Sequence, residues 1–253
     1  MSRKYSEHKC SRDVYRRRRR KKAGKKVAGA IAVILLSFII IFRTSSQDTQ
    51  SGFSQDPGTE SGDPHTLDTG APWYLTLVNR QNPVPEGYRP NLAKVQGGEQ
   101  VDERIYDPLM KMLEAAKEAN GNQLPHVVSG YRTESEQQRL YDDKISQYEK
   151  ERCSETEAKE LAEQWVAAPG YSEHQLGVAV DINGAVYDVY LWLQENSYKY
   201  GFIFRYPGDK TQITNVAEEV WHYRYVGVEA ATEIYEQGLC LEEYMEDMEN
   251  VLD

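Results

Sequence analysis

The chain has 253 residues and a formal net charge of −10, which averages two opposite populations. Residues 1–26 carry thirteen Lys and Arg against two acidic residues, a net +11, and the remainder carries 17 cations against 38 anions, a net −21. Such an asymmetry usually reports location. The three cysteines form no CxxC pair, so a cysteine-based zinc site has no support.

An uncharged segment follows the basic one. Residues 27–42 read VAGAIAVILLSFIIIF, and their only polar side chain is a serine. The segment is slightly shorter than the ~20 residues that span a bilayer, but the lysines at its start can snorkel. We expect an uncleaved transmembrane signal anchor, because the basic region is long and the sequence after Phe42 is a poor cleavage site. A cleaved signal peptide and a buried core helix are the alternatives.

The anchor implies an orientation. The positive-inside rule places residues 1–26 in the cytoplasm and the chain beyond Arg43 outside a single-pass cell membrane. The basic run could bind nucleic acid, but its position beside an apolar span favours anionic lipid, so we expect no nucleic-acid partner. Residues 43–72 are mostly Ser, Thr, Asp, Gln, Gly and Pro, a composition typical of a disordered linker.

Residues 73–253 are numerous enough for one domain with its own core. Capping boxes begin at Thr133 and at Ser154. The patterns predict helices over 102–120, 134–148, 154–166, 186–198 and 229–237, the last one closing the domain, and strands over 126–129, 177–182 and 221–226. Helices and strands are mixed without a regular βαβ rhythm, which predicts an α+β fold with a small antiparallel sheet and flanking helices. Cys153 and Cys240 could form one disulfide.

The predicted strand at 177–182 has two unlike faces, because side chains alternate along a strand. Val178, Val180 and Ile182 share a face that suits a core. The other face carries two very small side chains and then Asp181. Small side chains of this kind let another group lie close to the strand. His174 precedes the strand in a loop. Taken alone, Asp181 could simply end a strand and His174 could lie on the surface.

The last predicted strand contains His222 on the face opposite Trp221 and Tyr223. A satisfied core histidine is one interpretation of His222. Glu219 lies three residues earlier, and an odd separation in an unbroken strand would put the two on opposite faces. If Glu219 is to act beside His222, the chain must turn or bulge at about Val220.

A predicted strand-to-helix turn carries Arg132. An Arg at such a junction can point into a cleft, where its planar fork pairs with a carboxylate or a developing oxyanion. Gln137 lies one helical turn further on and can hydrogen-bond a peptide. The alternative for Arg132 is a surface cation paired with Glu136.

Three motifs occur in one order along the chain: SGYRT-x3-Q-x2-LY at 129–141, S-x-H-x2-G-x-A-x-D at 172–181, and E-x-W-H-x-R-Y-V at 219–226. Together they resemble the VanY-type D-alanyl-D-alanine carboxypeptidases, which are zinc peptidases of the M15 family. The likeness covers about residues 73–240. It implies a single zinc-peptidase domain that acts on the D-Ala-terminated stem peptide of peptidoglycan.

The resemblance also implies roles for individual residues. His174, Asp181 and His222 would bind Zn²⁺, Glu219 would be the general base and acid, and Arg132 would stabilise the oxyanion or hold the substrate. A mixed nitrogen and oxygen set suits zinc better than Ca²⁺ or Mg²⁺. The peptide-contacting residues would be Ser172 and Gln137, with Tyr131 in the same wall.

The expected activity is therefore that of a zinc-dependent D,D-carboxypeptidase, with a metal-activated water as nucleophile. Two relatives of this chemistry stay open, an L,D-carboxypeptidase that acts on tetrapeptide stems and a D,D-dipeptidase. A different class is a non-catalytic, membrane-anchored wall-binding domain, and the presence of Glu219 argues against it.

Overall fold

The computed structural model describes residues 72–252, apart from 124 and 185. The basic segment, the predicted anchor at 27–42 and the linker up to residue 71 lie outside this part of the chain. Within residues 72–252, apart from those two, no helix is both long enough and apolar enough to cross a membrane. The membrane anchor therefore stays a prediction.

The described elements are a mixture of helices and short strands. In chain order they are η2 (Trp73–Leu75), β1 (Leu92–Lys94), β2 (Gln100–Asp102), α3 (Glu103–Ala119), β3 (His126–Ser129), α4 (Glu134–Lys150), α5 (Glu155–Ala162), η3 (Glu173–Leu176), β4 (Ala179–Asn183), α6 (Tyr187–Asn196), η4 (Ser197–Tyr200), β5 (Phe202–Phe204), η5 (Gly208–Lys210), α7 (Thr211–Thr214), β6 (His222–Tyr225), α8 (Val228–Gln237) and α9 (Leu241–Leu252), where η marks a 3-10 turn. Of the described residues, 72–148 and 158–252 belong to one compact unit, which contains the sheets and the predicted site residues.

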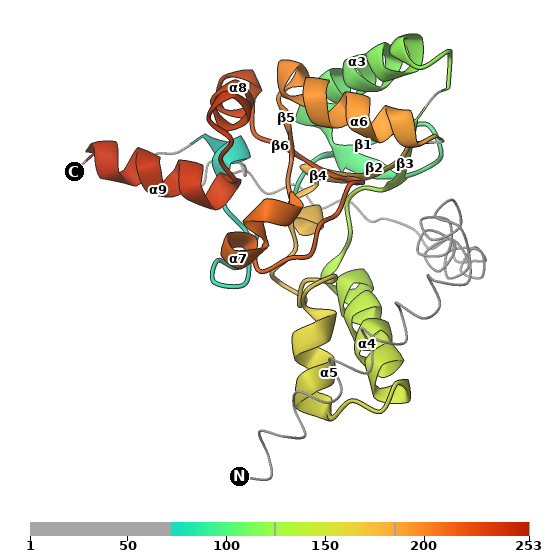
Figure 1. Cartoon of the computed structure of the whole chain (residues 1–253), viewed down its shortest axis with the longest axis vertical. Coiled ribbons are helices and arrows are strands. Elements are labelled where there is room, and N and C mark those ends of the chain that lie inside the picture. The colour runs from blue at the N-terminus through green and yellow to red at the C-terminus, as the bar shows by residue number, and fades with distance from the viewer. Residues whose placement is uncertain (1–71, 124, 185, 253) are drawn as a thin grey trace, which may run out of the picture. The chain divides into compact units, whose positions relative to one another are not determined.

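Four strands form one antiparallel sheet in the order β3-β4-β6-β5 (Figure 1). Asp181 in the central strand β4 is opposite Ser129 on one side and opposite His222 on the other. The predicted α+β fold with a small antiparallel sheet is confirmed. Strands β1 and β2 pair separately, also antiparallel.

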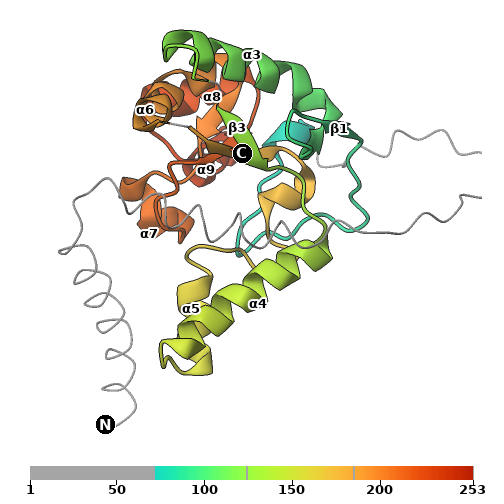
Figure 2. The same ribbon diagram turned by 90° about the vertical axis from the view of Figure 1, so that its right-hand side faces the viewer.

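One face of the four-stranded sheet carries the larger core. Val180 of β4 is opposite Tyr223 of β6, and both are completely buried. They pack with α3 and α6, which lie side by side against the sheet in both views (Figures 1 and 2). Helix α3 presents Ile105 and Leu109 to this core at the three-to-four-residue spacing of one helical face. The predicted apolar side of β4 is thus confirmed.

The opposite face of the sheet is mixed. Ile203 of β5 packs with Ala231 of α8 and Leu241 of α9 in a second core. Next to this second core, Arg224 of β6 is completely buried on the same side as Asp181 and His222, as strand alternation requires. Polar groups therefore occupy the middle of this face, where they must find partners inside the protein.

Several predicted boundaries move. The helix expected over 154–166 ends at Ala162, and the strand expected from Gly177 begins at Ala179 because Gly177 has left-handed backbone geometry, with φ at 74°. A further helix, α9, follows the helix that we expected to close the domain. Strand β5 was not predicted. Both capping boxes are present, with the hydroxyl and amide of Thr133 and Ser154 bonded to the carboxylates three residues later.

Cys240 is a free, buried thiol, so it does not pair with Cys153.

Candidate metal centre and catalytic site

Three buried side chains from separate elements converge on the polar side of the sheet. His174 comes from η3, Asp181 from β4 and His222 from β6, and one potential ligand atom of each lies within 4.8 Å of the others. The two imidazole rings are perpendicular, with centroids 4.9 Å apart. This convergence brings together the residues that the motifs singled out.

The distances between the donor atoms fit a small cation. Nε2 of His174 is 3.4 Å from Oδ2 of Asp181, and Nδ1 of His222 is 3.1 Å from Oδ1 of the same carboxylate. Tetrahedral ligands bound to zinc at about 2.0–2.1 Å lie about 3.3 Å from one another. Two imidazoles and one carboxylate are also the ligand types that zinc accepts. The residues present therefore fit a zinc ion.

His174 is held by a backbone carbonyl. Its Nδ1 lies 2.7 Å from the carbonyl oxygen of Gly130, which leaves Nε2 to face Asp181. Burial, with a contribution from the Arg132 charge, lowers the pKa of His174 to about 4, so the imidazole is neutral as a metal ligand must be. Residue 130 must be glycine, because a Cβ there would collide with the carbonyl oxygen of Gln100.

His222 has carboxylates at both ring nitrogens. Nδ1 faces Asp181, and Nε2 lies 3.4 Å from Oε2 of Glu173. Burial alone would lower the pKa of His222, but hydrogen bonds to Asp181 and Glu173 raise it to about 9. A cation bound at Nδ1 would displace the proton from that nitrogen and leave the Nε2 proton on the side of Glu173.

Glu219 reaches this centre because the chain turns just before β6. Val220 and Trp221 form the turn, and the amide of His222 donates to the carbonyl of Glu219 at 3.0 Å. The predicted turn at Val220 is confirmed. Oε2 of Glu219 lies 3.7 Å from Nδ1 of His222. Burial raises the pKa of Glu219 to about 8, although the neighbouring His222 opposes the shift.

Arg132 points at the cluster rather than at Glu136. Its guanidinium donates to Oδ2 of Asp181 at 2.7 Å, to the hydroxyl of Ser129 at 2.8 Å and to Oε1 of Gln137 at 3.3 Å. The fork of this Arg is therefore fixed by three partners. It places a permanent positive charge next to the candidate metal ligands.

The three residues predicted to contact substrate lie near Arg132 or His174 in the chain and differ in exposure. Gln137 is buried, and its amide nitrogen donates to the carbonyl of Ala167 at 2.7 Å while its oxygen accepts from Arg132. Ser172 is buried just before η3, and Tyr131 is half-buried. Both ends of the Gln137 amide are thus occupied by protein groups. The peptide contacts stay predictions.

Sequence reasoning missed a second buried charge group behind His222. Glu173 bonds to Arg205 at 2.8 Å and lies 3.2 Å from Arg224, and Arg205 also bonds to Glu242. Glu173 lies inside the SEHQ segment, but its partners come from β6 and from the residue after β5. The only available signal was an ionisable residue directly next to a predicted ligand.

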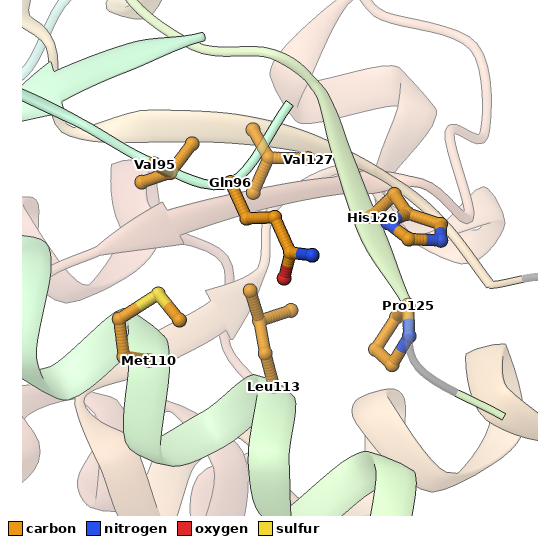
Figure 3. A pocket seen from close by; sticks show the side chains of 7 residues that line it. All are labelled: Val95, Gln96, Met110, Leu113, Pro125, His126 and Val127. Atoms are coloured by element: carbon orange, nitrogen blue, oxygen red, sulfur yellow. The ribbon is translucent and has the colours of Figure 1, made fainter. Parts of the chain in front are cut away.

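A small hollow lies between α3 and β3 (Figure 3). Its volume is about 20 Å³, room for about one water molecule. The residues that line it are mostly apolar, with His126 at the edge: Val95, Gln96, Met110, Leu113, Pro125, His126 and Val127. None of the predicted site residues lines this hollow, so it is not part of the candidate catalytic site.

Comparison with known proteins identifies the family. The model of the VanY family, described as D-alanyl-D-alanine carboxypeptidase, matches residues 98–228, more than half of the chain. The chain belongs to this family. A D-alanyl-D-alanine carboxypeptidase of Enterococcus faecalis is 54% identical over 178 residues, which cover 68% of this chain and 66% of that protein, just under two thirds of its length.

Solved structures agree with the VanY assignment. A mutant of the vancomycin resistance D,D-pentapeptidase VanY from a VanB-type cassette, in complex with Zn(II), is 52% identical with a TM-score of 0.66, over 69% of this chain and 99% of that one. The LD-carboxypeptidase LdcB is 36% identical with a TM-score of 0.57, over 68% of this chain and 86% of that one. At the level of the family, the predictions of a zinc-peptidase fold, a carboxypeptidase and a zinc cofactor are confirmed.

Proposed function

We propose that this protein is a zinc-dependent D,D-carboxypeptidase that removes the terminal D-Ala from peptidoglycan stem peptides. The observation that carries the proposal is the convergence of His174, Asp181 and His222 with Glu219 beside them. In this proposal the two imidazoles and the aspartate hold the ion. Zinc in such a set supplies a Lewis acid and lowers the pKa of water toward about 7.

Glu219 acts as the general base and then as the general acid. It accepts a proton from the attacking water and delivers it to the amine of the departing D-Ala. A base works best when its pKa lies near the operating pH, and burial raises the pKa of Glu219 to about 8. A carboxyl group in this condition can both take and return a proton.

Arg132 stabilises negative charge on the substrate. Its guanidinium is fixed by Ser129 and Gln137, so it needs no reorganisation when charge develops on the scissile carbonyl or when the terminal carboxylate binds. Gln137 then acts mainly by orienting Arg132, while Ser172 and Tyr131 line the peptide site.

Defined peptides test the proposal against its alternatives. The full-length protein is incubated with a pentapeptide that ends in D-Ala-D-Ala, a tetrapeptide that ends in a single D-Ala, and the free D-Ala-D-Ala dipeptide. We expect the pentapeptide to lose D-Ala fastest, with activity lost to a chelator and restored by Zn²⁺. Preference for the tetrapeptide would favour an L,D-carboxypeptidase, which the similarity to LdcB keeps as the second candidate.

The same experiment addresses the remaining alternatives. Preference for the dipeptide would indicate a dipeptidase. A protein that binds Zn²⁺ and the peptides but cleaves none of them would instead be a wall-binding domain, and the proposed function would be wrong.

We also propose that residues 27–42 anchor the enzyme as a single-pass protein, with the catalytic domain outside the cell membrane. The net charge of +11 before the uncharged segment supports this orientation, and the basic tail then meets anionic lipid. Protease added to intact cells should remove the catalytic domain and leave residues 1–26 protected. Release of the whole domain into the medium without protease would indicate a cleaved signal peptide instead.

A further inference from the structure

A chain of buried ionic contacts leads from His222 to the C-terminal helix α9. Nε2 of His222 lies 3.4 Å from one oxygen of Glu173, and the other oxygen accepts from Nε of Arg205 at 2.8 Å. The two terminal nitrogens of Arg205 donate to both oxygens of Glu242 at 2.8 and 2.7 Å. Arg205 therefore bridges a carboxylate of α9 and a carboxylate that touches a candidate metal ligand.

These charges are balanced and almost completely removed from water. The side chains of Arg205 and Arg224 are 0% exposed, that of Glu173 is 1% and that of Glu242 is 14%. Arg224 lies 3.2 Å from Glu173, so two guanidinium groups face two carboxylates. Buried charges are tolerated when each is paired. Removal of the Glu242 charge would leave this group with a net positive charge next to Glu173.

The position of Glu173 decides which nitrogen of His222 can bind a cation. A carboxylate at Nε2 holds the proton there and leaves the lone pair of Nδ1 directed at Asp181. Partners of this kind fix the tautomer and ring orientation of metal-bound histidines, and their loss typically weakens metal binding ~10–100-fold. Arg205 holds Glu173 in turn, because its Nε donates to the carboxylate at 2.8 Å.

We propose that Glu242 is a positioning residue for zinc binding, which acts through Arg205 and Glu173 to keep His222 in its metal-binding orientation. This inference rests on the proposed function, because it takes His222 as a zinc ligand. Glu242 lies in α9, outside residues 98–228 that the family model matches. The C-terminal helix is thus part of the metal site's support.

Zinc affinity of the full-length protein tests this directly. Dissociation constants are measured by competition with a chromophoric chelator for the native protein, Glu242→Gln, Glu173→Gln and the double variant. We expect each single variant to bind zinc about 10-fold more weakly. The double variant should bind no more weakly than Glu173→Gln alone, because Glu242 acts through Glu173. Glu242→Asp, which keeps the charge, should recover part of the loss.

The matched control is Glu243→Gln. Glu243 is the next residue of α9, and its carboxylate binds Lys210 and the amide of Cys240 instead of the buried group. This variant should lower the unfolding temperature without changing zinc affinity.

Native zinc affinity in Glu242→Gln, or a full additional loss in the double variant, would overturn the inference. If Glu242→Gln does not fold, Arg205→Lys replaces it with the same expected and contrary outcomes, because a point charge cannot bridge both carboxylates as the fork does. Failure of the native protein to bind zinc would instead contradict the proposed function.

Discussion

Two buried carboxylates approach the same imidazole from opposite sides, yet their surroundings give them opposite properties. Glu219 lies on the Nδ1 side of His222, and burial raises its pKa to about 8. Glu173 lies on the Nε2 side, where burial alone would raise its pKa, but Arg205 and Arg224 hold it far below the usual range. The difference comes from the guanidinium groups. The carboxyl group on the Nδ1 side of His222, that of Glu219, can therefore exchange a proton. The carboxylate on the Nε2 side, that of Glu173, stays ionised.

The largest expected effect comes from Glu219→Gln, which removes the carboxylate on the proton-exchanging side. We expect kcat to fall about 10²–10⁴-fold, the usual contribution of a general base, while zinc affinity is retained. Release of D-Ala and zinc binding are measured on the same preparation. The control is Glu218→Gln, one residue earlier and exposed, which should keep its activity. A Glu219→Gln protein as fast as the native one would remove Glu219 from the mechanism.

Arg205→Met removes one of the two cations beside Glu173 and should raise the pKa of Glu173 toward that of Glu219. Deletion of one partner from a buried ionic group costs about 3–5 kcal/mol of the free energy of unfolding. Urea denaturation at pH 7 measures the loss. Lys210→Met, which breaks the more exposed pair with Glu243, should cost much less. Equal losses of unfolding free energy in the two variants would contradict the larger contribution that we assign to the buried ionic group.

The smallest expected effect is on acid stability. Burial acts to raise the pKa of Glu242, but Arg205 outweighs it and the pKa is lowered. A lowered folded-state pKa adds stability that is complete above the unfolded-state value of about 4.3 and is lost as the pH falls through the folded-state value. The stability difference between the native protein and Glu242→Gln should therefore shrink below about pH 4. A constant difference down to pH 2 would be the contrary result.

Much of the candidate site could be predicted from the sequence because its candidate ligands lie within strongly patterned segments. The alternation around Asp181 predicted which side of β4 is apolar, and the spacing of Glu219 and His222 required the turn that the structure contains. Strand β5 escaped prediction because three residues are too few to display an alternation. Local periodicity predicts which face of a strand or helix is apolar. It does not predict which other element packs against that face.

The charge group behind His222 was beyond sequence reasoning for a different reason. Glu173, Arg205 and Glu242 are far apart in the chain. Each is of a residue type that is mostly exposed to solvent in folded proteins. Only the fold reveals that they are buried and paired. Helix α9 carries many acidic residues, so its sequence gave no sign that one of them turns inward.

Gly130 has no functional group, yet it determines where an imidazole 44 residues away is held. Its carbonyl is the anchor of His174, and its missing side chain lets the backbone lie against Gln100. In a mutational scan, every replacement at position 130 should therefore resemble loss of the histidine itself. A residue without a side chain thus controls the orientation of a candidate metal ligand through its backbone alone.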